Sequence, residues 1–213
     1  MITIKTKRDL RKVELGIAAN KAALVEQISK AFREQGIQMP KRLKGLVSSD
    51  DVFAYHYSAM ENLHLVENED GEVCVQPDCD EWEDPLDTGF LFDLIYIAEN
   101  MAMEETTDGS DLAYWWDVSS KWSRQTKKEL ARFITKRMEN KKQRILPVYE
   151  KWDEDDVMQR FAGLTTNSDF YWYLVHDEDG DVVLQAYEDR KVKYTDSLTS
   201  LYIEELLWIA QNV

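Results

Sequence analysis

Apolar residues recur at intervals of three and four positions in two long stretches of the chain, and this spacing predicts two amphipathic helices. The first stretch lies between Thr6 and Gly36, and the second lies between Thr126 and Pro147. Both stretches are rich in lysine and arginine, so we expect basic helices with one apolar stripe. The apolar positions are Leu10, Val13, Ile17, Leu24, Ile28, Ala31 and Phe32 in the first, and Leu130, Phe133, Ile134 and Met138 in the second.

The first helix carries signals at its ends and in its interior. Thr6 followed by Asp9 resembles a capping box in which Asp takes the role of Glu. Gly36 is a suitable C-cap, and Pro40 prevents direct continuation of the helix. Gly16 inside the pattern costs about 1 kcal/mol relative to Ala. We therefore expect the helix to break or weaken at Gly16.

Two Asp-Gly pairs, Asp70-Gly71 and Asp179-Gly180, each stand between two runs of alternating apolar residues. An Asp-Gly pair suits a tight turn that needs a positive φ, because glycine has no Cβ to clash there. The sequence therefore predicts two β-hairpins. Their strands are expected at Asn62–Glu67 with Glu72–Gln76 and at Phe170–His176 with Asp181–Tyr187, while Val52–Tyr57 fits either a strand or a helix.

A strongly apolar helix is predicted after each hairpin. We expect Asp87 or Thr88 to cap the first of these helices and Asp196 or Ser197 to cap the second. Between the second hairpin and its helix, Val192 and Tyr194 alternate with lysines, which predicts a third strand over Lys191–Tyr194. The apolar residues of the two helices are Phe90, Leu91, Leu94, Ile95 and Ala98, and Leu201, Ile203, Leu206, Leu207 and Ala210.

The two halves of the chain resemble each other. Residues 69–76 (EDGEVCVQ) align with residues 178–185 (EDGDVVLQ) at an offset of 109, and residues 90–101 align with residues 202–213 at an offset of 112. A basic helix precedes each segment, so we interpret the chain as an internal duplication rather than a chance similarity of two hairpin–helix segments.

The predicted fold class is α+β, with two tandem copies of a helix–β-hairpin–helix unit, antiparallel sheets covered by helices and a pseudo-twofold relation. We expect a first repeat at residues 1–104 and a second at residues 126–213. Residues 105–125, which contain Trp115, Trp116 and Trp122, would form a Trp-rich connector packed between them. One sheet shared by both repeats and two separate lobes both remain open.

Charge is distributed in four blocks. Residues 1–45 contain eleven Lys or Arg and four Asp or Glu, and residues 120–151 contain eleven and three. Residues 46–119 contain no Lys or Arg and twenty Asp or Glu, while residues 152–213 contain four and fourteen. The net charge of the 213 residues is −15. The electrostatic field of a chain with this charge would repel a phosphate backbone. We therefore expect no direct binding of DNA or RNA.

The candidate residues for chemistry do not form a recognisable site. Cys74 and Cys79 are too few donors for structural zinc, and a nucleophilic pair of Cys74 with His64 has no third group to orient it. The segment that begins at Asp177 has alternating carboxylates but lacks the central glycine of an EF-hand calcium loop. Phosphate-binding, serine-hydrolase and zincin motifs are absent from the sequence. We therefore expect no catalytic residue, no cofactor and no metal site.

The remaining feature is a dense set of acidic residues with an aromatic residue among them. We expect these side chains to bind a basic protein, because negative potential speeds encounter with a cationic partner and an aromatic side chain can anchor it. They are Glu69, Asp70, Asp78, Asp80, Glu81, Trp82, Glu83, Asp84, Asp177, Glu178, Asp179 and Asp181.

Proteins with such surfaces include immunity proteins that block toxins and DNA mimics that occupy nucleases or other nucleic-acid-binding proteins. An inhibitor of this kind is therefore our first hypothesis. The main alternative is an enzyme or small-ligand-binding protein with a site between the two repeats. Acidity that serves only solubility, and self-association of basic helices with acidic blocks, are further alternatives.

The expected location is the cytoplasm. The uncharged runs are shorter than the roughly 20 apolar residues of a membrane span, and the first residues lack the apolar region of a secretory signal. Two cysteines cannot make a disulfide scaffold. We expect no membrane association.

Overall fold

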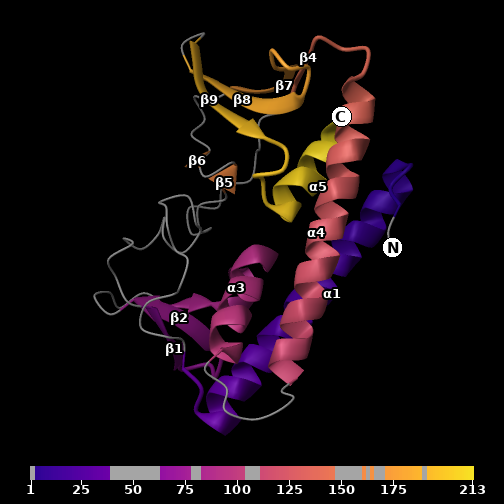
Figure 1. Ribbon diagram of the computed structural model, residues 1–213. Helices are drawn as coiled ribbons and strands as arrows, with labels where there is room; N and C mark the ends of the chain where they lie inside the picture. The colour runs from indigo at the N-terminus through magenta and orange to yellow at the C-terminus, as the bar shows by residue number, and fades with distance from the viewer. Residues whose placement is uncertain are drawn as a thin grey trace. The chain divides into compact units, whose positions relative to one another are not determined.

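This computed structural model contains both helices and antiparallel sheets (Figure 1), which confirms the α+β class. Contacts group the chain into two compact units, residues 15–123 and residues 1–14 with 124–213. The two long helices each contribute residues to both units. The structure describes residues 3–38, 63–77, 83–103, 111–146, 160–161, 164–165, 171–188 and 191–213, so the segment 52–57 lies outside the described residues.

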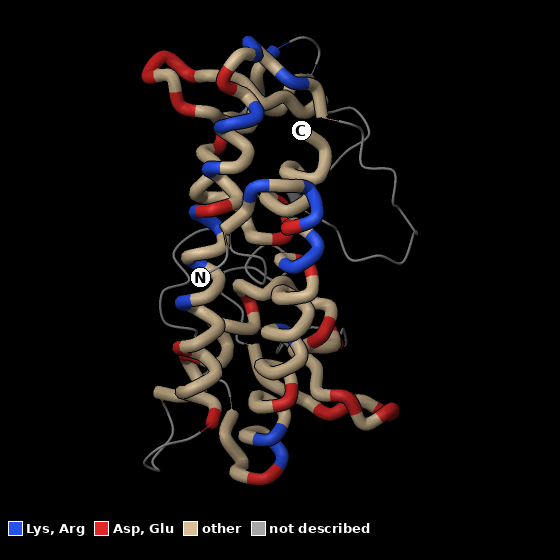
Figure 2. Tube along the Cα trace, turned by 90° about the vertical axis from the view of Figure 1, so that its right-hand side faces the viewer, with Lys and Arg blue, Asp and Glu red and all other residues tan. Residues whose placement is uncertain are grey.

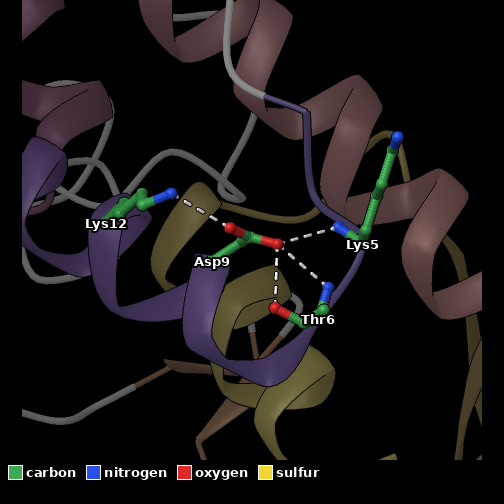
Figure 3. A network of polar contacts seen from close by, with 4 residues as sticks. All are labelled: Lys5, Thr6, Asp9 and Lys12. Atoms are coloured by element: carbon green, nitrogen blue, oxygen red, sulfur yellow. Dashed lines mark hydrogen bonds and ion pairs between the residues drawn. The ribbon is translucent and has the colours of Figure 1, made fainter.

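Helix α1 spans Lys7–Gln35 and begins at a polar network that Figure 3 shows. One oxygen of Asp9, Oδ2, accepts hydrogen bonds from the Thr6 hydroxyl (2.9 Å), the Thr6 N–H (3.0 Å) and the Lys5 N–H (3.2 Å). The other oxygen, Oδ1, pairs with Lys12 Nζ at 3.2 Å. These contacts, the Thr6 hydroxyl foremost, hold the pKa of Asp9 well below its ordinary value of 3.8. Asp9 thus reaches back to the helix start as predicted.

The C-terminal end of α1 also follows the sequence signal. Gly36 has a φ of 68°, in the left-handed region that favours glycine. The Ile37 N–H donates to the Ala31 carbonyl, six residues back, at 3.1 Å, so the chain turns back on the last turn of the helix. Gly36 is therefore the predicted C-cap.

The expected break at Gly16 is wrong, because α1 is continuous from Lys7 to Gln35. A Cβ on Gly16 would overlap Cζ2 of Trp122 and lie 3.0 Å from Cη2 of the same ring. The glycine therefore lets an indole ring approach the backbone of α1 closely. Contact with Trp122 offsets the propensity cost that the sequence pattern emphasised.

Helix α4 spans Asp111–Met138 and starts well before Thr126, where the apolar pattern had placed its beginning. Thr126 is buried in the interior of the helix. Trp115, Trp116 and Trp122 belong to the same continuous helix. The chain segment expected as a Trp-rich connector is thus largely helical, whereas the division into repeats at 104 and 126 stays a prediction.

The unit at residues 15–123 contains a three-stranded antiparallel sheet in the order β1-β2-β3. Leu65 pairs with Val75, and Gly71 between the strands has a φ of 78°, which confirms the predicted hairpin and its turn. The side chains of Leu65 and Val75 are buried, as is most of the apolar face of the helix that follows. The elements are β1 (Leu63–Glu67), β2 (Val73–Pro77), β3 (Asp84–Pro85), η1 (Leu86–Thr88) and α3 (Leu91–Ala102).

The unit at residues 1–14 and 124–213 contains a four-stranded antiparallel sheet in the order β4-β7-β8-β9, with a separate pair β5-β6. Leu174 pairs with Leu184, and Gly180 has a φ of 86°, so the second predicted hairpin is also confirmed. The predicted third strand extends to Ser197. The elements are β4 (Gln143–Ile145), β5 (Arg160–Phe161), β6 (Leu164–Thr165), β7 (Tyr171–His176), β8 (Val182–Glu188), β9 (Lys191–Ser197) and α5 (Ile203–Asn212).

The two hairpins have equal hydrogen-bond registers. In the first, the pairs run from Leu63↔Pro77 to Glu67↔Val73, and in the second from Trp172↔Ala186 to His176↔Val182. The third strands also pair alike, since Cys74 faces Pro85 and Val183 faces Ser197. These positions differ by the sequence offsets of 109 and 112, so the two turns occupy corresponding places in their hairpins.

The predicted caps of the two short helices are wrong, because both helices begin later. The N-cap of α3 is Phe90, whose N–H donates to Asp93 Oδ2 at 2.9 Å. The N-cap of α5 is Tyr202, whose N–H donates to Glu205 Oε2 at 2.7 Å. In each helix the acidic side chain at the third helical position thus makes one half of a capping box, in which it accepts the N–H of the N-cap residue. The expected caps lie in preceding elements, with Asp87 and Thr88 in η1 and Asp196 and Ser197 in β9.

Candidate partner-binding site

The first acidic turn, Asn68–Glu72, joins β1 to β2. The Asn68 N–H donates to the Glu72 carbonyl (3.0 Å), and Asn68 Oδ1 accepts the Glu72 N–H (2.8 Å). The Gly71 N–H donates to the Asn68 carbonyl at 3.0 Å. Glu69 and Asp70 are exposed at the tip of this turn. The backbone is thus closed by its own hydrogen bonds while both carboxylates face solvent.

The second acidic turn, Asp177–Asp181, joins β7 to β8 in the same way. The Asp177 N–H donates to the Asp181 carbonyl (2.9 Å), and the Gly180 N–H donates to the Asp177 carbonyl (3.1 Å). Asp177 Oδ1 accepts the N–H groups of Asp179 (3.0 Å) and Asp181 (2.8 Å). Asp177 therefore orders the turn, whereas the side chains of Glu178, Asp179 and Asp181 are exposed.

The other predicted partner-binding residues lie near β3. Glu83 is exposed immediately before this strand, and Asp84 is half-buried within it. Asp78, Asp80, Glu81 and Trp82 lie outside the described residues. The structure therefore describes eight of the twelve predicted residues, and seven of these, all except Asp84, are exposed or lie in an acidic turn.

Ion pairs within the described residues leave the tips of both acidic turns without a cation. Basic side chains of α1 and α4 pair instead with acids on the helices, as in Lys30–Asp111 (3.4 Å) and Lys121–Asp117 (2.6 Å), or with Glu67 of β1, as Arg33 does (3.1 Å). Figure 2 shows the acidic positions in short runs along the chain and the basic positions spaced along the helices.

Each acidic turn is fastened at its base by a side chain that the sequence analysis missed. In the first, Arg33 of α1 donates from Nη2 to the Gly71 carbonyl, and its Nε pairs with Glu67 Oε2 at 3.1 Å. In the second, His176 Nδ1 lies 3.0 Å from the Gly180 carbonyl, and Nε2 lies 3.3 Å from the Met138 carbonyl of α4.

Hydrogen bonding to these carbonyls, that of Gly180 foremost, raises the pKa of His176 above its ordinary value of 6.5. Glu67 and His176 are the last strand residues before the two turns, at the same sequence offset as the turns themselves. A charged or titratable residue at that shared position is the signal that would have directed attention to the anchors.

Cys74 and His64 do not form a nucleophilic pair. Cys74 faces Val66 across the hairpin, and His64 Nε2 lies 3.2 Å from Gln76 Oε1. Burial, together with the nearby carboxylates of Glu83 and Glu72, raises the pKa of Cys74 to about 11. Cys74 is therefore a protonated thiol at neutral pH and a poor nucleophile.

The buried ionisable groups have structural partners. Asp93 and Glu205 are 2% and 3% exposed and accept the N–H groups at the starts of α3 and α5. Burial lowers the pKa of Lys127, and the negative charges of Glu205 and Glu204 oppose this shift. Asp93 and Glu205 thus serve the starts of two helices.

Among the residues that the structure describes, no three His, Cys, Asp or Glu side chains are grouped so that they could hold a metal ion. Within the same ranges, every helix is too short or too polar to cross a bilayer. Comparisons of the chain with protein-family models, with curated proteins and with solved structures found no match.

Proposed function

We propose that the protein is a non-enzymatic, cytoplasmic binding protein that inhibits a basic, nucleic-acid-handling partner, in the manner of an immunity protein or a DNA mimic. One observation carries this proposal. Two tight turns present exposed carboxylates that no cation neutralises among the described residues. Such negative potential attracts a cationic surface and repels anionic competitors.

The construction of the turns suits such a role. Each turn is closed by backbone hydrogen bonds, and each is fastened at its base, by Arg33 in the first and by His176 in the second. A preorganised turn loses little conformational entropy when a partner binds. Carboxylates held in this way can occupy positions where a nuclease or other nucleic-acid-binding protein receives phosphates.

We also propose that the two acidic turns arose by tandem duplication of one helix–β-hairpin–helix unit, with copies within residues 1–104 and 126–213. Equal strand registers support this proposal, as do the Asp93 and Glu205 caps at corresponding positions of α3 and α5. Asn100 and Asn212 also correspond, because each donates from Nδ2 to the carbonyl four residues earlier. Duplication would give the chain two versions of one docking element.

Affinity capture from a lysate of the native host, with purified protein as bait, tests the proposed function. The bait is compared with Glu69→Gln/Asp70→Asn in the first acidic turn and Glu178→Gln/Asp179→Asn in the second. Glu26→Gln/Glu34→Gln serves as a matched control, because it removes two exposed charges from α1. Each bait is used at low and at physiological salt.

We expect the natural protein and the control to retain a basic protein that at least one turn variant loses. Added duplex DNA should compete with this capture, and the retained protein should lose its nucleic-acid activity when the natural protein is added. Capture that is equal for all four baits would contradict a role of the turns. Retention of only acidic or neutral proteins would contradict the proposal as a whole.

A further inference from the structure

The two acidic turns are anchored at corresponding carbonyl groups by side chains of different chemistry. The carbonyl of Gly71 accepts from Arg33, and the carbonyl of Gly180 lies 3.0 Å from His176 Nδ1. A guanidinium stays charged throughout the physiological pH range, whereas an imidazole titrates within it. The anchors of the two turns therefore differ in their response to pH.

Both ring nitrogens of His176 lie against acceptors. A backbone carbonyl can only accept, so the contacts to Gly180 (3.0 Å) and Met138 (3.3 Å) both need an N–H on the ring. A neutral imidazole has one N–H, so both hydrogen bonds form together only in the imidazolium. Loss of the proton removes one of the two bonds and leaves the turn fastened at a single point.

The position of Met138 favours the protonated ring further. Met138 is the last residue of α4, where carbonyl groups lack partners within the helix and the helix dipole is negative. Its carbonyl also accepts the Lys141 N–H at 2.8 Å. A positive charge at the C-terminal end of a helix is stabilised, and the protonated His176 ring carries such a charge.

The charged groups around His176 come from two elements. On its own turn, the nearby carboxylate of Asp177 favours the imidazolium. The segment after α4 carries the exposed side chains of Glu139, Lys141 and Lys142, whose charges are of both signs. The carbonyl groups of Gly180 and Met138 contribute more than these charges to the protonation of His176.

We propose that His176 is a pH-dependent clasp that links the second acidic turn to the end of α4 when it is protonated and breaks this link when it is neutral. The first acidic turn, fastened by Arg33, stays in place over the same pH range. Because the pKa of His176 is raised in the folded protein, the clasp is fully formed below pH 6.5 and is lost as the pH rises through the raised value.

This inference concerns the order of a turn and does not depend on the proposed binding function. If the proposed function holds, the partner meets an ordered second turn under mildly acidic conditions and a loosened one under alkaline conditions. The first turn would bind alike under both conditions.

Amide hydrogen exchange and NMR titration of the full chain test the clasp. The amides of Gly180 and Asp177 report the second turn, and those of Gly71 and Asn68 report the first, because each donates a hydrogen bond that closes its turn. Protection factors, corrected for the intrinsic pH dependence of exchange, are compared across pH 5 to 9. The His176 ring is titrated in the same samples.

We expect protection at Gly180 to fall roughly fivefold, as for the loss of one hydrogen bond, with the midpoint of the His176 titration. Gly71 should show no such step. The variant His176→Arg should keep Gly180 protected at every pH, and His176→Gln should leave it weakly protected at every pH.

Three results would overturn the clasp. These are a His176 titration at or below the ordinary value, a Gly180 protection factor that does not change with pH, and an equal step at Gly71. If the arginine variant fails to fold, the comparison of Gly180 with Gly71 in the natural protein still decides between these outcomes.

Discussion

At Gly16 the intrinsic preference of the residue and its packing act in opposite directions. Glycine weakens the interior of a helix, and the sequence pattern therefore favoured a break there. The structure keeps α1 continuous, with the Trp122 ring lying where a Cβ would otherwise be. A glycine that lets a distant side chain approach the helix backbone has the same sequence neighbours as a glycine that breaks a helix. The sequence alone therefore cannot distinguish the two.

Replacement of Gly16 by alanine tests this interpretation. The gain in helix propensity is about 1 kcal/mol, and overpacking against an indole costs typically about 1 to 3 kcal/mol. We expect Gly16→Ala to lower the free energy of unfolding, measured by urea denaturation. In a Trp122→Phe background, where the overlapping Cζ2 atom is gone, the same replacement should be neutral or stabilising. A stabilising Gly16→Ala in the natural protein would show that the ring moves aside at little cost.

At the scale of elements, the two short helices share a cap that comes from inside the helix. Asp93 and Glu205 sit at the third helical position and accept the N–H of an aromatic N-cap residue. Both are buried, so each carboxylate is held away from water beside a helix N-terminus, whose dipole favours negative charge. This arrangement explains why these two acidic residues are tolerated at buried positions of α3 and α5.

Removal of either cap should destabilise the protein. We expect Asp93→Leu and Glu205→Leu each to lower the free energy of unfolding by about 1 to 2 kcal/mol, because the N–H of the N-cap residue loses its acceptor. The corresponding isosteres, Asp93→Asn and Glu205→Gln, should cost less because an amide oxygen still accepts. Urea denaturation measures the effect, and Glu99→Gln on α3 serves as a control of equal charge. Leucine variants as stable as the control would show that the cap contributes little.

At the scale of the whole molecule, a net charge of −15 opposes folding through self-repulsion. The exposed carboxylates of the acidic turns add to this repulsion, and no cation among the described residues offsets them at the tips. The proposed binding role would account for carboxylates that the fold itself does not need.

The turn variants used for affinity capture therefore give a prediction about stability. We expect Glu178→Gln/Asp179→Asn to leave the free energy of unfolding unchanged or slightly higher at low salt, with the difference shrinking as salt screens the repulsion. Asp117→Asn, which breaks the pair with Lys121, should not stabilise the protein. Urea denaturation at two salt concentrations measures both. A marked loss of stability in the turn variant would show that its carboxylates hold the fold together.

The sequence predicted local features well. Alternating apolar residues around Asp-Gly located both hairpins, and the glycine at each turn has the positive φ that the turn requires. The signals at Asp9 and Gly36 placed both ends of α1. These features depend on residues close together in the chain, so they can be predicted from the sequence.

The sequence did not predict the features that depend on distant residues. The start of α4 was missed because a helix rich in tryptophan and serine has little periodicity at its N-terminal end. The anchors of the turns were missed because Arg33 and Gly71 are far apart in sequence, as are His176 and Met138.

The amino-acid sequence by itself thus determined the two hairpins, the ends of α1, the acidic turns and the segregation of charge, because propensity, turn geometry and charge are properties of short segments. Only the tertiary structure decided that Gly16 accommodates an indole, that Cys74 is a buried thiol and that one acidic turn is held by an arginine and the other by a histidine. Each of these depends on which side chain the fold brings to a given atom, and that is settled by packing between segments remote in sequence.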